Sequence, residues 1–377
     1  MDAEPLPTIP LFDVRAGGPV EHARLRRQEM LALRNACFSM IPAPLRGIVR
    51  PLDRISARWL KASPSPYVGE IDRIAGIAGR PGVWFVNASY EWGCTTRIDV
   101  EPTPILRRTL DWPFAGLGRH VEVALQDGGA GAYANVTWPG AVGVLTAVAP
   151  GRFAAAINQG PMYRRTKATA LLPADFLLNG YGAWWHPGRW PAAHLLRFAF
   201  DTCATFNEAV ALLTETPLAR PALFSIVGAA PGEGCLIERT ETAAVVRAGP
   251  CCIANDWHPA GPARPGRWIA RGSLIRGPED SENRRTLLGA HGCNAPFAWL
   301  VDPVLNGLTR LAVETSPATG ELRIVGFEPT SKRMSAVAPA TQILEGRVGP
   351  GQGSWTTAQI QGRSSSPAMA RTLESQP

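Results

Sequence analysis

The sequence predicts an α+β fold in which antiparallel strands occupy the middle of the chain and helical blocks lie on either side. Short runs of β-branched and apolar residues, separated by turn signals, follow one another from about position 94 to 158. Helical spacing of apolar residues marks stretches before and after this region. With 45% hydrophobic and 18% charged residues, the 377-residue chain can also bury a large core. These observations favour packed layers over a parallel sheet of alternating strands and helices.

The N-terminal quarter is expected to be helical after a loose arm over residues 1–18, which contain Pro and Gly. The pattern EHARLRRQEMLALRNACF predicts a helix within Val20–Met40. A basic amphipathic segment, Leu45–Leu60, is interrupted by Pro51. It either packs on the domain as a solvated helix or lies on a membrane surface, so peripheral membrane contact stays open.

A Ser-Pro-Ser-Pro break at 63–66 precedes the next predicted helix, Tyr67–Ala78, which ends at the turn residues 80–82. The strand-like runs that follow are CTTRIDV, ILRRTLDW, HVEVALQD, AYANVTW, AVGVLTAV and FAAAIN. Helices are predicted within 191–215 and over Ser281–Leu288, and strands at ALFSIVGA, CLIERT, AAVVRAG, Leu308–Glu314 and Glu321–Gly326. The tail 346–377 has few large apolar residues and is expected to be disordered.

Charge and hydropathy exclude several classes of protein. The net charge is +7, but the 38 basic residues are scattered without a run of five, so we expect no nucleic-acid partner. No stretch of about 18 uncharged apolar residues occurs, which argues against a spanning helix. The N-terminus MDAEPLPTIPLFDV lacks a basic region followed by an apolar one, so a cytoplasmic protein is expected.

The cysteines are odd in number and include no CxxC pair, which argues against a disulfide scaffold and a zinc site. No metal or other cofactor is expected. Most of the thiols should be small buried groups, with one or two at most carrying chemistry. They are Cys37, Cys94, Cys203, Cys235, Cys251, Cys252 and Cys293.

Cys94 has the context of a nucleophile that acquires its own base. No histidine lies in a recognisable Cys/His protease pattern, so a Cys-His dyad is possible but has no support in the sequence. A free α-amino group, with a pKa near 8, is an alternative base if Cys94 becomes an N-terminus. Gly93 adds no side chain beside the bond to be cut. Attack of the Cys94 thiol on the preceding carbonyl would release residues 1–93 and a fragment 94–377.

From Tyr67 to Asn158 the chain resembles the N-terminal-nucleophile amidases of the acid ceramidase and N-acylethanolamine acid amidase group. More distantly it resembles choloylglycine hydrolases and penicillin acyltransferases. The motifs that carry the resemblance, in chain order, are EIDRIAGIAGRPGVWFVNASYEWGCTT, Arg108-Thr109-Leu110-Asp111-Trp112, WPGAVGVLTAVAPGRFAAAIN, Ala254-Asn255-Asp256-Trp257-His258 and Asp280-Ser281-Glu282-Asn283-Arg284-Arg285.

The resemblance implies a four-layer αββα sandwich of two antiparallel sheets, preceded by a helical N-terminal segment. It also implies domain limits: an arm with helices (1–62), the end of an α-subunit (63–93), a β-subunit forming the core (94–345) and the tail. The fragments 1–93 and 94–377 would stay associated after cleavage. In this reading WFVNASYE forms a strand that leads to the nucleophile.

The resemblance also implies a role for each site residue. Cys94 would be the nucleophile, Asp111 would hold its α-amino group and Arg108 would favour the thiolate. Asn255 would donate to the oxyanion, although a turn-capping asparagine is an equal alternative. Asn158 and Thr95 would line the same hole. Arg284 would anchor the carboxylates, or Arg285 in its place, and a helix-surface arginine is the plain alternative for either.

The expected function is hydrolysis of a linear non-peptide amide with an apolar acyl group, of which fatty N-acyl amides are the first class. Acyl transfer and β-lactam or bile-salt amidase action remain alternatives. Gln159 stands where the ceramidase branch often has Glu, and Thr96 where the family commonly has Ser. The first difference keeps a second reading open, in which the chain is an unprocessed, non-catalytic binding protein.

Overall fold

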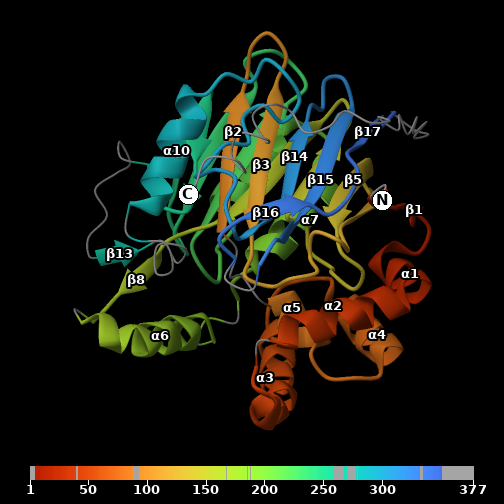
Figure 1. The fold of residues 1–377 in the computed structure, drawn as a ribbon, viewed down its shortest axis with the longest axis vertical. Helices are drawn as coiled ribbons and strands as arrows, with labels where there is room; N and C mark the ends of the chain where they lie inside the picture. Colours follow the sequence, from red (N-terminus) through yellow and green to blue (C-terminus); the bar gives the residue numbers. More distant parts are fainter. Residues whose placement is uncertain are drawn as a thin grey trace.

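The computed structural model describes residues 5–39, 41–88, 93–166, 168–184, 186, 188–258, 267–269, 277, 279–331 and 334–349. Figure 1 shows two sheets packed face to face, with a group of N-terminal helices to one side of them. None of the helices in these ranges is both long enough and apolar enough to cross a membrane. The expected disordered tail from 346 lies mostly outside the described residues, and a strand continues through its first two positions.

The first sheet has eight strands in the order β1-β4-β5-β6-β7-β9-β10-β11. Neighbours pair antiparallel except β1, which pairs parallel with β4. The predicted loose arm is therefore wrong at β1, whose backbone extends the sheet edge. The strands are β1 (Leu11–Asp13), β4 (Glu122–Gly128), β5 (Gly131–Thr137), β6 (Thr146–Ala149), β7 (Phe153–Gln159), β9 (Ala222–Gly228), β10 (Gly234–Arg239) and β11 (Ala244–Ala248).

The second sheet runs β12-β2-β3-β14-β15-β16, and β17 also pairs with β15. Its strands are β12 (Cys251–Ile253), β2 (Gly93–Asp99), β3 (Ile105–Asp111), β14 (Thr309–Thr315), β15 (Glu321–Pro329), β16 (Val337–Pro339) and β17 (Leu344–Arg347). A small pair outside both sheets joins β8 (Met162–Arg164) to β13 (Arg267–Ile269).

Four layers follow from how these elements pack, as the resemblance implied. Strands β2 and β3 face β7 and β9 across the sandwich. Helices α7 (Ala192–Thr202) and α8 (Phe206–Glu215) cover the first sheet, and α10 (Asp280–Ala290) covers the second. The alternation along β7 shows why: Ala154 and Ala156 lie in the core between the sheets, while Phe153, Ala155 and Ile157 pack under the helices.

The helices of the N-terminal segment differ from the sequence prediction in three places. The helix expected over Val20–Met40 is two helices, with the break at Arg26. The stretch WFVNA forms a helix, not the strand that the resemblance implied. Pro51 does not interrupt its helix because it lies in the first turn, where a missing N–H is tolerated. The helices are α1 (Gly18–Leu25), α2 (Arg27–Ser39), η1 (Ala43–Ile48), α3 (Val49–Lys61), α4 (Val68–Ala78) and α5 (Val83–Ala88).

Buried polar contacts hold this segment against the sandwich. His22 Nε2 lies 2.6 Å from a Glu122 carboxylate oxygen, with both side chains buried. Arg197 on α7 donates to both carboxylate oxygens of Glu70 on α4, at 2.6 and 3.0 Å. Ser65 Oγ lies 2.9 Å from His194 Nδ1. These contacts cross from residues 1–93 to the rest of the chain.

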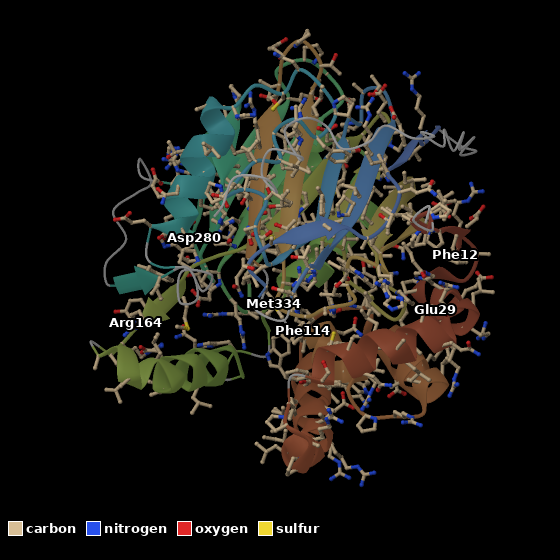
Figure 2. The ribbon with its side chains drawn as sticks, viewed as in Figure 1. Phe12, Glu29, Phe114, Arg164, Asp280 and Met334 are labelled. Carbon is tan, nitrogen blue, oxygen red and sulfur yellow. The ribbon has the colours of Figure 1, made fainter. Side chains whose placement is uncertain are left out.

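The sequence reading missed a helix next to the small β8–β13 pair. After the short turn η2 (Thr169–Leu171), helix α6 (Leu172–Trp184) runs beside β8. Arg164, labelled where β8 approaches α6 in Figure 2, donates from Nε to buried Asp175 at 2.7 Å. Leu177 and Leu178 of α6 are exposed to solvent, as are Ile48 at the end of η1 and Ile55 in the middle of α3.

Candidate active site

Cys94 is the second residue of β2, and its side chain points between the two sheets. Antiparallel pairing places Cys94 opposite Leu110 and Thr96 opposite Arg108. Because alternate residues share a face, Arg108 lies on the same inner face as the thiol. Its Nη2 donates to Cys94 Sγ at 2.6 Å, and the thiol in turn lies 3.7 Å from the carbonyl oxygen of Ile157 on β7.

The thiol is fully buried, with 0% of Cys94 exposed in the intact chain. This burial raises the pKa of the Cys94 thiol above its ordinary value, while the charge of Arg108 acts to lower it. Desolvation is the larger effect, so the thiol is protonated at neutral pH in this state. A reactive thiolate therefore needs either a base or access of water to the site.

Asn255 holds the backbone nitrogen of Cys94. The Cys94 N–H donates to Asn255 Oδ1 at 2.9 Å, and Asn255 Nδ2 donates to the Gln159 carbonyl at 3.1 Å. The turn itself is stabilised by Ser281, whose hydroxyl oxygen accepts from the backbone N–H groups of Asn255 and Asp256, both at 2.9 Å. The Asn255 side chain is thus directed at the cysteine, and the capping side chain is that of Ser281.

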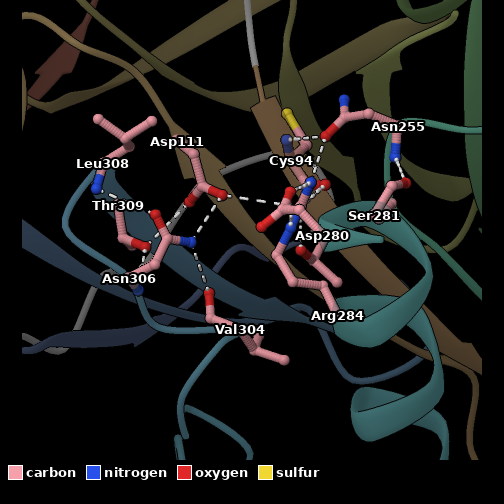
Figure 3. Close-up of polar contacts among 12 residues, drawn as sticks. Cys94, Asp111, Asn255, Asp280, Ser281, Arg284, Val304, Asn306, Leu308 and Thr309 are labelled. Carbon is pink, nitrogen blue, oxygen red and sulfur yellow. Dashed lines mark hydrogen bonds and ion pairs between the residues drawn. The ribbon is translucent and has the colours of Figure 1, made fainter. Parts of the chain in front are cut away.

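Arg284, from α10, connects most of the site (Figure 3). Its Nη1 donates to the Cys94 carbonyl and to Thr95 Oγ1, each at 2.6 Å, and its Nη2 donates to Asn255 Oδ1 at 2.9 Å. Asp280, one helical turn earlier, accepts from its Nε at 3.0 Å. Of the two candidate arginines it is Arg284 that reaches the cysteine, since Arg285 pairs with Glu282 on the outer side of the helix.

Asp111 lies on the opposite face of β3 from Arg108. It pairs with Gly93, the residue before the cysteine, and its side chain points toward α10. The carboxylate accepts from the Thr309 hydroxyl at 2.9 Å and from Asn306 Nδ2 at 3.0 Å, and it lies 3.7 Å from Arg284. Arg108 and Asp111 are both buried, so they are not an ordinary exposed strand pair.

Asn158 and Thr95 hydrogen-bond to residues next to the cysteine and Asn255. Asn158 accepts from the Thr96 hydroxyl at 2.7 Å and donates to the Ala254 carbonyl at 2.9 Å. The Asn158 amide group therefore connects β7 to the segment that follows β12, which carries Asn255. Thr95 Oγ1 accepts from Arg284 on the face away from the thiol. In this geometry both residues support the site from its edges.

Sequence reasoning did not single out Asn306, Thr309 or, as a residue with its own role, Ser281. Ser281 had a signal, because it lies in the Asp-Ser motif quoted for the resemblance. Asn306 and Thr309 lie in no motif and contact Asp111 across almost 200 positions of sequence. Within the residues that the structure describes, no group of three or more His, Cys, Asp or Glu side chains could hold a metal ion.

Comparison with known proteins gives one match in sequence and several in structure. No family model matches the chain. Over 205 residues the chain is 28% identical to the N-acylethanolamine-hydrolyzing acid amidase of Cavia porcellus, covering 50% of this chain and 51% of that protein. The chain thus spans about half the length of the curated relative it matches.

Two solved structures of other proteins superpose on this chain with low TM-scores. The Caenorhabditis elegans ortholog of N-acylethanolamine-hydrolyzing acid amidase has a TM-score of 0.43 at 19% identity, covering 60% of this chain and 93% of that one. A mutant of conjugated bile acid hydrolase from Clostridium perfringens has a TM-score of 0.35 at 9% identity, covering 67% of this chain and 96% of that one. Over about half of its length the chain is therefore similar in sequence to N-acylethanolamine-hydrolyzing acid amidase.

Proposed function

We propose that this protein is a self-processing cysteine amidase that hydrolyses a linear, non-peptide amide. One observation carries the proposal: the two Cys94 atoms that the reaction would use, and the Cys94 carbonyl oxygen beside them, are each held by a different side chain. Arg108 contacts the sulfur, Asn255 accepts from the nitrogen and Arg284 binds the carbonyl oxygen. A structural cysteine in a strand needs none of these three contacts.

Self-cleavage would begin with attack of the Cys94 sulfur on the carbonyl carbon of Gly93. The S–C bond forms, the C–N bond breaks and the nitrogen takes up the thiol proton, which leaves a thioester to Gly93. Water then hydrolyses the thioester. The products are fragment 1–93, which ends in a Gly93 carboxylate, and fragment 94–377, which begins with the free amine of Cys94.

Turnover would use the same atoms with the amide substrate in place of the Gly93 carbonyl. The free α-amine accepts the thiol proton and passes it to the leaving amine, so that an acyl-thioester remains. The same amine then activates the water that releases the acid. Asn255 Nδ2, which donates to the Gln159 carbonyl in the intact chain, would turn to the oxyanion of the tetrahedral intermediate.

Access to the site would have to open between these two reactions. In the intact chain the thiol is fully buried, and the nearby cavity along Ile157–Met162 has a volume of about 30 Å³. That volume holds about one water molecule and no acyl chain. Cleavage frees the chain before Cys94 to move, and water entry would remove the desolvation that raises the thiol pKa.

The substrate class is proposed from the matched relative, whose name describes hydrolysis of N-acylethanolamines. A fatty N-acyl amide also suits the surface of the protein. Ile48 and Ile55 are exposed beside Arg54 and Arg58, an arrangement that would let the protein rest on a membrane holding such lipids. The buried pairs of His22 and Arg197 would keep the two fragments together after cleavage.

A denaturing gel tests the proposal directly. Cleavage at Gly93–Cys94 divides the 40.4 kDa chain in the ratio 93 to 284, which gives bands of about 10 and 30 kDa. Cys94→Ala should abolish both bands and the release of fatty acid from an N-acylethanolamine. The matched control is Cys235→Ala, because Cys235 is also a buried strand cysteine but lies in β10. Fragments that persist in Cys94→Ala would show that a contaminating protease made them.

The complete burial of Cys94 favours one second candidate, an uncleaved chain that acts as a binding protein. The two candidates differ in the same experiment. An intact band after incubation from pH 4 to 9, together with a Cys94 that resists alkylation in native protein, would support the binding protein and overturn the amidase.

A further inference from the structure

Two neutral hydrogen-bond donors hold the Asp111 carboxylate: Asn306 in the turn before β14 and Thr309, the first residue of β14. The Thr309 hydroxyl lies 2.9 Å from Asp111 Oδ1, and Asn306 Nδ2 lies 3.0 Å from Asp111 Oδ2. Figure 3 shows both side chains reaching the carboxylate from the turn that leads into β14, on the side away from the thiol. Arg284 is more distant from it at 3.7 Å, because its guanidinium binds the Cys94 carbonyl and Asn255.

A β-bulge brings Thr309 to this position. On β14, Thr309 pairs with Asp111 and Leu311 pairs with Leu110, so Arg310 has no opposite residue on β3. In regular pairing the residue next to Leu311, which is Arg310, would stand opposite Asp111. The bulge thus replaces a cation with a hydroxyl at this place, as bulges near active sites can re-aim a side chain.

Arg310 itself is held away from the carboxylate. It is fully buried, and its guanidinium donates to the carbonyl oxygens of Thr309 at 2.8 Å, Gly307 at 3.2 Å and Phe114 at 2.8 Å. These bonds turn its charge toward the loop backbone. The two hydrogen bonds to Asp111 from Thr309 and Asn306 thus come from neutral groups.

The hydroxyl direction of Thr309 follows from its second contact. The backbone N–H of Asn306 donates to Thr309 Oγ1 at 3.0 Å, so that oxygen acts as the acceptor there and its own hydrogen points to Asp111. The Asn306 side chain is oriented as well, because its Oδ1 accepts from the Leu308 N–H at 3.0 Å. Its amide hydrogens can then only face the carboxylate and the nearby carbonyl oxygens of Pro303 and Val304.

We propose that Asn306 and Thr309 are positioning residues that keep Asp111 ionised and aimed to receive the ammonium group of Cys94 once the chain is cleaved. This inference rests on the proposed function. Asp111 pairs directly with Gly93 in the sheet, so it lies beside the position where that ammonium group would form. Hydrogen bonds to a carboxylate favour its charged form, and neutral donors do this without competing for the incoming cation.

The test measures amide hydrolysis by the cleaved protein as a function of pH. Thr309→Val keeps the shape of the side chain and removes the hydroxyl. Loss of one hydrogen bond to a charged group should move the acidic limb of the profile up by about one to two pH units. Thr309→Ser restores the hydroxyl and should return the limb to its wild-type position. A merely structural role would lower the yield of folded protein and leave the limb in place.

Thr315→Val is the matched control, because Thr315 lies buried on the same strand and donates its hydroxyl to the Glu321 carbonyl at 2.8 Å, away from the site. It should leave the pH profile unchanged. If Thr309→Val does not fold, Asn306→Asp decides the matter. It replaces a donor with a second carboxylate and should move the acidic limb up at least as far as the valine variant.

The possible outcomes separate this inference from the proposed function. If wild-type protein neither cleaves nor hydrolyses an N-acylethanolamine, the proposed function fails and this inference fails with it. If wild-type protein is active and both Thr309→Val and Asn306→Asp keep its acidic limb, only the positioning role is overturned. An equal shift in Thr315→Val would also overturn it, because the shift would then not depend on contact with Asp111.

Discussion

The contact between Arg108 and Cys94 predicts the direction in which the thiol pKa should move when the charge is removed. Nη2 lies 2.6 Å from Sγ in a fully buried site. Because the guanidinium charge is spread over three nitrogens, an effective separation of about 4 Å is appropriate. At an effective dielectric constant of about 20 the attraction is then about 4 kcal/mol. Removal of this attraction disfavours the thiolate, so Arg108→Met should raise the pKa of the thiol in the cleaved chain.

The effect on reactivity is smaller than the effect on ionisation. At a fixed pH below both pKa values, the thiolate fraction falls about 1000-fold. A more basic thiolate is also a better nucleophile, with a Brønsted coefficient of about 0.4–0.5, so the rate of alkylation should fall only about 30- to 60-fold. The assay is alkylation with iodoacetamide from pH 5 to 11. Mass spectrometry of the peptide that begins at Cys94 restricts the measurement to cleaved molecules.

Arg107→Met serves as the control for removing a buried arginine from β3. Arg107 points to the other face of the strand, where it pairs with Asp99 and lies 3.6 Å from Glu314. Its profile should match that of wild type. The reasoning is refuted if Arg108→Met gives the wild-type midpoint, or if Arg107→Met moves the midpoint as far.

Three other contacts can be tested in the same protein. Arg197→Met removes the cation that pairs with the partly buried carboxylates of Glu70 and Asp201, and it should lower the free energy of unfolding by about 1–3 kcal/mol in urea. An unchanged midpoint would contradict the ion-pair account. Ile48→Glu with Ile55→Glu should weaken flotation with phosphatidylserine vesicles about tenfold or more, and equal binding would exclude this surface as the membrane contact. Burial lowers the pKa of His194 to about 3. Since the unfolded chain binds a proton below about pH 6.5 and the folded chain does not, stability should fall by about 1.4 kcal/mol per pH unit from there toward pH 3. His194→Gln should flatten this slope in urea titrations at pH 5 and 7. His186→Gln changes an exposed histidine and should keep the slope. The same slope in both variants would show that His194 does not cause the pH dependence of stability.

The local sequence pattern predicted which helices and strands form better than it predicted where they begin and end. Runs of β-branched and apolar residues between turn signals located the strands around Cys94 and Arg108, because such residues fit the surface of a sheet. The break at Arg26 and the strand β1 had no such signal. A helix can continue through Arg26 by propensity alone, and β1 exists because its backbone finds a partner edge in β4.

By itself the sequence determined that a cysteine follows Gly93 and that an arginine and an aspartate follow at fixed spacing on the next strand. Only the tertiary structure decided that Arg284 reaches the cysteine and that Thr309 faces Asp111. The physical reason is range. The alternation of a strand is fixed by its own few residues, whereas these contacts depend on a helix packed over the sheet and on a bulge that shifts pairing between segments 198 positions apart.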